Sequence, residues 1–130
     1  MLNILFWSWC LPQTLLGFII KSFYKLTDKI AKVITYKSAR VVFIKNWKFT
    51  GVSLGKYIIL NESEDGNINT FKHEYGHTIQ SFILGITYLF VVGIPSVIRN
   101  IKCQAKSLPY EEYYKKYPEN WADKLGGVTR

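Results

Sequence analysis

Residues 69–82 read NTFKHEYGHTIQSF and contain both histidines of the chain. Their apolar and aromatic side chains recur at steps of three and four residues, which is the spacing of one face of an α-helix. Asn69 or Thr70 can cap the start of that helix. The stretch therefore predicts a helix from about Asn69, whose repeat consists of Phe71, Tyr75, Thr78, Ile79 and Phe82.

His73-Glu74-Tyr75-Gly76-His77 is an H-E-x-x-H motif within this predicted helix. Because a helix has 3.6 residues per turn, His73 and His77 lie one turn apart and can direct both imidazoles at one metal ion. Glu74 lies about 100° around the helix axis from His73, where it reaches a water at the metal more easily than the metal itself. Zinc suits such a pair, and a catalytic zinc site needs a third protein ligand. The alternative is two histidines at helical spacing without a metal.

A later segment offers the third ligand. Residues 119–123 read ENWAD and place Glu119 and Asp123 one turn apart on a predicted helix that begins at Pro118 and ends at Gly126-Gly127. Glu119 can then bind the metal while Asp123 accepts the free N–H of a ligand histidine. The other carboxylates considered as ligands show no comparable pattern: Glu62, Glu64, Asp65, Glu111 and Glu112.

These two motifs resemble those of the gluzincin metallopeptidases, the thermolysin-like zinc enzymes that carry H-E-x-x-H on one helix and E-x-x-x-D on a later one. The resemblance implies a Zn²⁺ ion bound by His73, His77 and Glu119. It also implies that Glu74 polarises the attacking water and that Asp123 orients a histidine ligand. Four stretches, 11–17, 73–81, 93–96 and 121–127, look like a group of short bacterial proteins, a resemblance that implies no activity.

Two residues near the motif have more than one reading. Glycine within a helix costs about 1 kcal/mol relative to alanine. Gly76 therefore has two explanations. It allows another backbone segment or a substrate to approach closely, or it allows two helices to pack tightly. Gln80 follows on the same helix, where it either lines a cleft or serves at the surface or as a cap.

The whole sequence predicts one α+β domain over residues 1–130, a small zincin-like fold whose few-stranded sheet packs on the H-E-x-x-H helix beside further apolar helices. Residues 1–28 form an apolar N-terminal helical region, with a helix from about Leu11 to Thr27. Residues 29–66 are the β region, with a hairpin or meander over 29–46, a strand at Tyr57–Leu60 and an acidic loop. Residues 67–130 form the helical metal-binding region, which includes a helix from Pro109 to Tyr117. The strand Tyr57–Leu60 is either an edge strand that pairs with an extended substrate or an internal strand.

The chain has 17 Lys and Arg against nine Asp and Glu, a net charge of +8 that favours an anionic partner. No RNP-like, helix-turn-helix or C₂H₂ pattern is present, which argues against nucleic acid and favours an anionic membrane surface. The uncharged run Leu2–Ile20 is either a membrane-bound or interfacial helix or a buried core helix. It lacks the basic start and the cleavage site of a secretory signal, so we expect a cytoplasmic protein or one at the cytoplasmic membrane.

A second uncharged run spans Thr78–Ile98. Glycine and proline interrupt it, so the pattern predicts a helix, a turn near Gly93–Pro95 and a second short helix. A membrane crossing here would place His77 and Glu119 on opposite sides of a hydrocarbon core about 30 Å thick. Because the ligands of one zinc ion must converge, we expect the segment to fold back against the helix after Leu11.

Together these patterns predict a zinc-dependent metallopeptidase that hydrolyses peptide bonds in a peptide or protein substrate, with Glu74 activating the water. The alternative is a non-catalytic zinc-binding protein that associates with a membrane or with a protein partner. A water in the fourth coordination position would favour the enzyme, and a fourth protein ligand would favour the structural site.

Overall fold

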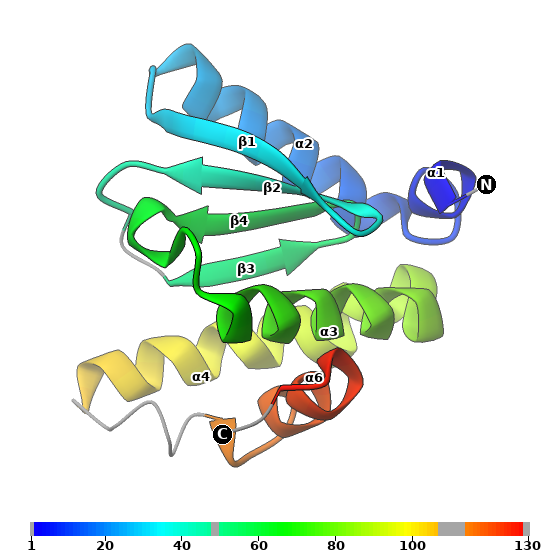
Figure 1. The fold of residues 1–130 in the computed structure, drawn as a ribbon. Coiled ribbons are helices and arrows are strands. Elements are labelled where there is room, and N and C mark those ends of the chain that lie inside the picture. Colours follow the sequence, from blue (N-terminus) through cyan, green and yellow to red (C-terminus); the bar gives the residue numbers. More distant parts are fainter. Residues whose placement is uncertain (1, 48–49, 107–113, 129–130) are drawn as a thin grey trace.

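The computed structural model describes residues 2–47, 50–106 and 114–128. Its architecture is α+β, with a four-stranded mixed sheet between helices, as Figure 1 shows. Helix α2 (Leu11–Leu26) packs on one face of the sheet, and helix α3 (Ile68–Leu84), which contains the H-E-x-x-H motif, packs on the other. The predicted α+β class with a few-stranded sheet is therefore confirmed.

The strands lie in the spatial order β1-β2-β4-β3. β1 (Ile30–Tyr36) and β2 (Ala39–Ile44) form the predicted antiparallel hairpin. β2 pairs in parallel with β4 (Tyr57–Asn61), and β4 pairs antiparallel with the short strand β3 (Gly51–Leu54). The strand predicted at Tyr57–Leu60 is thus internal, and its interpretation as an edge strand is wrong. β3, which the sequence pattern does not predict, is an edge strand, as is β1 at the other end of the sheet.

The two central strands are buried on both faces. Because successive side chains of a strand point to opposite faces, β2 and β4 are apolar except at Arg40 and Asn61 and so fill two layers. On one side their alternate residues pack against Phe71 of α3, with Tyr75 beside it. On the other side the intervening residues pack with Ile20 and Tyr24 of α2 and with Leu89.

The N-terminal region is helical, as predicted. A short helix α1 (Leu2–Phe6) precedes α2, whose bounds agree with the predicted Leu11–Thr27 to within one residue. On its inner side α2 carries buried polar residues, among them Gln13, whose amide donates to the carbonyl of Gly85 at 2.8 Å. Its outer side is exposed, so α2 is only half covered and is not a buried core helix. Among the described helices, none combines the length and the hydropathy that a bilayer crossing requires.

The apolar segment after α3 folds back, but not where glycine and proline predicted. The chain turns at Gly85, which has a φ of 58° and begins a 3₁₀ turn, η2 (Gly85–Thr87). A Cβ at Gly85 would lie 2.1 Å from the ring of Trp9, so only glycine fits there. A π-helical turn η3 (Leu89–Gly93) then leads directly into α4 (Ile94–Ala105). The turn expected at Gly93–Pro95 is therefore wrong, because both residues are accommodated within helical backbone.

Helix α6 (Glu119–Gly126) completes the described structure and packs against α3 (Figure 1). It follows the predicted start at Pro118, and Gly127 ends it with a φ of 76°, as a C-terminal glycine does. Most of the helix predicted from Pro109 to Tyr117, with the candidate ligands Glu111 and Glu112, lies outside the described residues.

Candidate metal centre

Close packing of α3 against α6 builds the site. A Cβ on Gly76 would lie 1.9 Å from the carbonyl oxygen of Ala122, and one on Gly126 would lie 1.8 Å from that of Lys72. Glycine at each position therefore lets one helix backbone touch the other. Of the two readings of Gly76, tight helix packing is the one that the structure supports. The approach brings Glu119 of α6 against the H-E-x-x-H face of α3.

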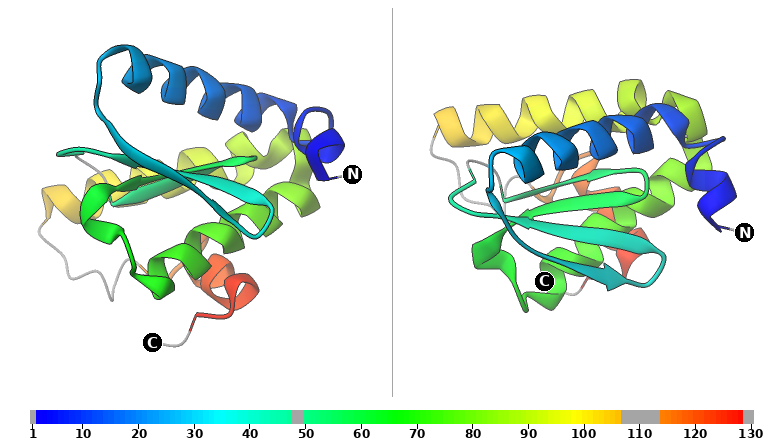
Figure 2. Two further views of the ribbon diagram at one scale, coloured as in Figure 1. Left: turned by 45° about the horizontal axis from the view of Figure 1, so that its top comes forward. Right: turned by 90° about the horizontal axis from the view of Figure 1, so that it is seen from above.

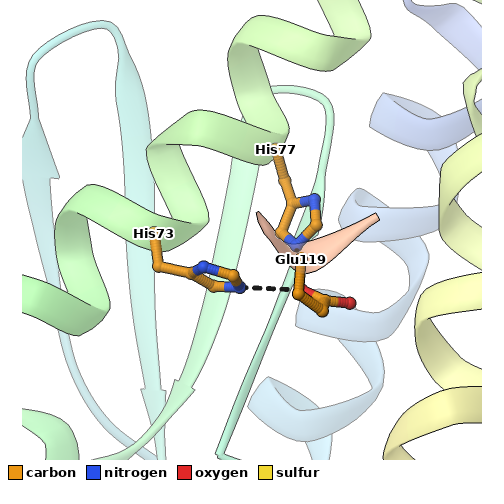
Figure 3. A group of neighbouring side chains, drawn as sticks. All are labelled: His73, His77 and Glu119. Atoms are coloured by element: carbon orange, nitrogen blue, oxygen red, sulfur yellow. Dashed lines mark hydrogen bonds and ion pairs between the residues drawn. The ribbon is translucent and has the colours of Figure 1, made fainter. Parts of the chain in front are cut away.

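Three side chains converge between these helices. Nε2 of His73 and Nε2 of His77 each lie 2.8 Å from Oε2 of Glu119. The candidate ligand atoms of the three residues all lie within 4.8 Å of one another, and all three side chains are buried. Figure 3 shows the two imidazoles from α3 directed at the Glu119 carboxylate. The structure thus brings together the three residues predicted as metal ligands.

Each histidine is held by a hydrogen bond from its other ring nitrogen. Nδ1 of His73 donates to Oδ1 of Asp123 at 2.6 Å, the pairing predicted for Asp123. Nδ1 of His77 donates to Oε1 of Gln80 at 2.6 Å, and the Gln80 amide donates to the carbonyl of Pro118 at 3.3 Å. With Nδ1 donating, a neutral imidazole presents the lone pair of Nε2, which is the atom that points into the site.

Two further residues contact the candidate ligands: Gln80, for which the sequence left two alternatives open, and Ser96, which the sequence did not identify. Gln80 is fully buried and orients His77, so the alternative of a surface or capping role is wrong. The hydroxyl of Ser96, at the start of α4, donates to Oε1 of Glu119 and leaves Oε2 for the histidines. The position of Gln80 three residues after His77, on the same face of one helix, was the available signal. Ser96 gave no such signal because it reaches the site only through the fold-back at Gly85.

The charges of the centre are strongly coupled. Burial lowers the pKa of His73, but its hydrogen bonds with Asp123 and Glu119 outweigh burial and raise the pKa to about 9. Burial raises the pKa of Glu119, but His77 and His73 outweigh that effect and hold it well below its usual range. Glu119 is thus a fully buried carboxylate that requires a positive charge beside it. A proton on His73 supplies that charge in the metal-free chain, and a metal ion can replace the proton.

Glu74 lies beside the three candidate ligands but is not one of them. Burial raises the pKa of its carboxyl, and His73 and His77 offset this effect in part. Its Oε2 is buried and has no hydrogen-bond partner among the described residues. A buried polar atom without a partner costs free energy, so Oε2 is suited to accept a hydrogen bond from a bound molecule. A Cβ placed on Gly51 of β3 would lie 3.2 Å from the other oxygen, Oε1, so the edge strand runs directly past this carboxyl.

The donor set of the centre suits a divalent ion such as zinc, which accepts imidazole nitrogen and carboxylate oxygen. The upstream carboxylates considered as ligands lie elsewhere: Asp65 pairs with Lys32 at 2.6 Å, and Glu64 accepts a hydrogen bond from Asn67. Comparison of the chain with protein-family models, with curated proteins and with solved structures finds no match. The function is therefore inferred from the residues of the site.

Proposed function

We propose that the protein is a zinc-dependent metallopeptidase with a zincin-like fold, which hydrolyses peptide bonds with water. The observation that carries this proposal is the convergence of His73, His77 and Glu119 on one point, beside the buried and unpartnered carboxyl oxygen of Glu74. Both imidazoles are already oriented by hydrogen bonds, so the ligand atoms are in place before an ion arrives.

His73, His77 and Glu119 would hold the ion. When bound, zinc would supply Lewis-acid activation of the scissile carbonyl and of the attacking water. Glu74 would accept a proton from that water as its oxygen bonds to the carbonyl carbon. It would then give the proton to the amine that leaves as the C–N bond breaks.

The number of ligands favours catalysis over a structural zinc site. Within residues 2–47, 50–106 and 114–128, no fourth His, Cys, Asp or Glu belongs to the cluster. Structural zinc sites are ordinarily closed by four protein ligands, whereas catalytic sites have three and keep one position for water or substrate. The arrangement therefore supports the enzyme rather than the non-catalytic zinc-binding alternative.

The position of β3 supports a peptide as the substrate. β3 pairs with β4 along one side only and is an edge of the sheet. The backbone of an extended peptide can pair with such an edge. The hydroxyl of Tyr88 donates a hydrogen bond to the carbonyl of Ser53 at 2.9 Å. The part of β3 that would pair with a substrate peptide is therefore at Gly51. A peptide paired there would pass beside the Glu74 carboxyl.

A cavity of about 220 Å³ adjoins the same part of β3. Gly51 and Ser96 line this cavity and also touch the centre, through Glu74 and Glu119 respectively. A cavity of about 150 Å³ suffices for benzene, so this one can hold a leucine or phenylalanine side chain. We expect cleavage next to a large apolar residue, because the remaining lining is mainly apolar: Leu16, Ile20, Trp47, Val52, Leu54, Val97 and Asn100.

The test is a peptide-library digest by the zinc-loaded chain and by its Glu74→Gln variant. Gln keeps the size of the side chain but cannot take a proton, so the variant should retain zinc and lose hydrolysis. Glu62→Gln, the same change at an exposed residue of the 3₁₀ turn η1 (Glu62–Glu64), is the control and should cleave like the wild type. Cleavage by Glu74→Gln at the wild-type rate, or no cleavage of any peptide by the zinc-loaded wild type, would contradict the proposal.

A further inference from the structure

Helix α2 presents an apolar surface to the outside along its whole length. Its inner side is buried at Gln13, Thr14 and Gly17. The outer side of a helix on a soluble domain is ordinarily polar. Here the outer side instead exposes seven large apolar side chains, namely Leu11, Leu15, Leu16, Phe18, Ile19, Phe23 and Leu26.

The fold-back segment presents a second apolar surface. On α4 the inner side is buried at Asn100 and Cys103, whereas Phe90 in the preceding π-helical turn is 74% exposed. The exposed side chains continue along the outer side of η3 and α4 with helical spacing. They are Phe90, Val91, Ile94, Val97, Ile98 and Ile101.

These two surfaces lie on the same side of the sheet. Ile20 of α2 and Leu89 of η3 pack on one and the same face of it. The right-hand view of Figure 2 shows α2 and α4 running in the same direction on that side. Leu16 and Val97, which are themselves exposed, line the cavity between the two helices and connect them. We refer to the outer sides of α2 and of η3 with α4 as the apolar face.

The charged side chains on α2, η3 and α4 are all positive, and the nearest acidic residue to α2 in the sequence is Asp28, which lines a pocket with Lys21 and Lys25. The sequence has no Asp or Glu in residues 1–27 or 75–110, which include both helices. At 100° per residue, Lys25 lies on the flank of the exposed apolar side of α2, and Lys102 lies on that of α4. Both lysines are exposed. Lys21 and Arg99 add further positive charge on the same helices.

We propose that the apolar face binds the surface of an anionic lipid bilayer, with the two helices lying in the interface. Helices of this kind bury apolar side chains about 5–10 Å deep, and basic residues at their flanks contact anionic headgroups. A second copy of the chain would have to bring like-charged lysines together, in a molecule that already carries a net charge of +8. An anionic bilayer complements both the apolar centre and the basic flanks.

The test is co-sedimentation of the full-length chain with phosphatidylcholine vesicles, with or without phosphatidylglycerol. We expect binding to the anionic vesicles, weakened by salt. Ile19→Asp and Ile101→Asp should each weaken it at least about tenfold, because they place a charge where an apolar side chain is buried. Ile68→Asp is the matched control: Ile68 is 53% exposed, against 54% for Ile19 and 51% for Ile101, but lies on α3 on the opposite side of the sheet. It should bind like the wild type.

Single basic residues give a second set of variants. Lys25→Ala and Lys102→Ala should each weaken binding about fivefold, the contribution of one cation near an anionic surface. Lys124→Ala, an exposed lysine on α6, should have no effect. Glu74→Gln should bind vesicles like the wild type, because Glu74 lies on α3 and not on the apolar face. The membrane-binding proposal therefore stands even if the peptidase proposal fails.

Three results would overturn the proposal. One is binding to pure phosphatidylcholine as tight as to anionic vesicles. A second is unchanged binding by Ile19→Asp in a chain whose circular dichroism shows it to be folded. The third is a dimer in lipid-free solution that Ile19→Asp dissociates, because the apolar face would then be covered by a second copy.

Discussion

Gly76→Ala tests whether the helix contact itself assembles the metal centre. The new Cβ would lie 1.9 Å from the carbonyl oxygen of Ala122, whereas real contacts of this kind stay above about 3.0 Å. The two backbones would have to separate by at least about 1.1 Å. Alanine itself favours a helix by up to about 1 kcal/mol, but overpacking costs about 1–3 kcal/mol, so we expect a net destabilisation of up to about 2 kcal/mol.

The same separation of the two backbones should weaken zinc binding. Glu119 lies on α6, three residues before Ala122, and its Oε2 is 2.8 Å from Nε2 of both histidines. Zinc tolerates deviations of only about 0.2 Å in its ligand distances, so a shift of about 1 Å should weaken zinc binding more than tenfold.

The assays are zinc competition with a chromophoric chelator and urea unfolding of the metal-free chain. Gly93→Ala is the control, because Gly93 is helical and its nearest neighbour would be 3.3 Å from the added Cβ. That variant should be as stable as the wild type or more so, with unchanged zinc affinity. If Gly76→Ala behaves like Gly93→Ala, the contact between α3 and α6 does not position the ligands as we describe.

Three further predictions follow from the centre and the cavity. Asp123→Asn should weaken zinc binding about 10–100-fold, since it removes the charge that orients His73, whereas Asp65→Asn, at a surface ion pair, should not. In EDTA, the free energy of unfolding should fall by about 3 kcal/mol as pH rises from 6.5 to 9. The reason is that folding raises the pKa of His73 from 6.5 to about 9, so the stabilising proton on His73 is lost over that range. An unfolding free energy that does not change with pH would contradict this. Val97→Trp should fill the cavity and lower kcat/KM for peptides with leucine or phenylalanine at the cleavage site, with smaller loss for alanine peptides and no loss of zinc.

Local patterns in the sequence were sufficient to identify the candidate ligands in two pairs, although not the packing of α3 on α6 that brings the pairs together. His73 and His77 are neighbours because a helix repeats every 3.6 residues, and the same period relates Glu119 to Asp123. Each pair is therefore specified within five residues, whatever the rest of the chain does. The hairpin and the helices α2, α3 and α6 were predictable for the same reason, because periodicity and turn residues are local signals.

The features that the sequence did not reveal depend on contacts between distant residues. Gly85, rather than Gly93, makes the turn because Trp9, 76 positions earlier, occupies the space that a side chain would need. β3 is four residues long and pairs with one strand only, too short for an alternating pattern to stand out. Ser96 meets Glu119 only after the chain has folded back.

The most direct test of the account is the zinc content of the purified chain after exhaustive dialysis, measured by elemental analysis beside His77→Ala. His77 would supply one of the three proposed ligands, and two are too few to retain the ion. We predict one zinc per chain in the wild type and none in His77→Ala. No zinc in the wild type, or full occupancy in His77→Ala, would contradict the assignment of His73, His77 and Glu119 as a metal centre.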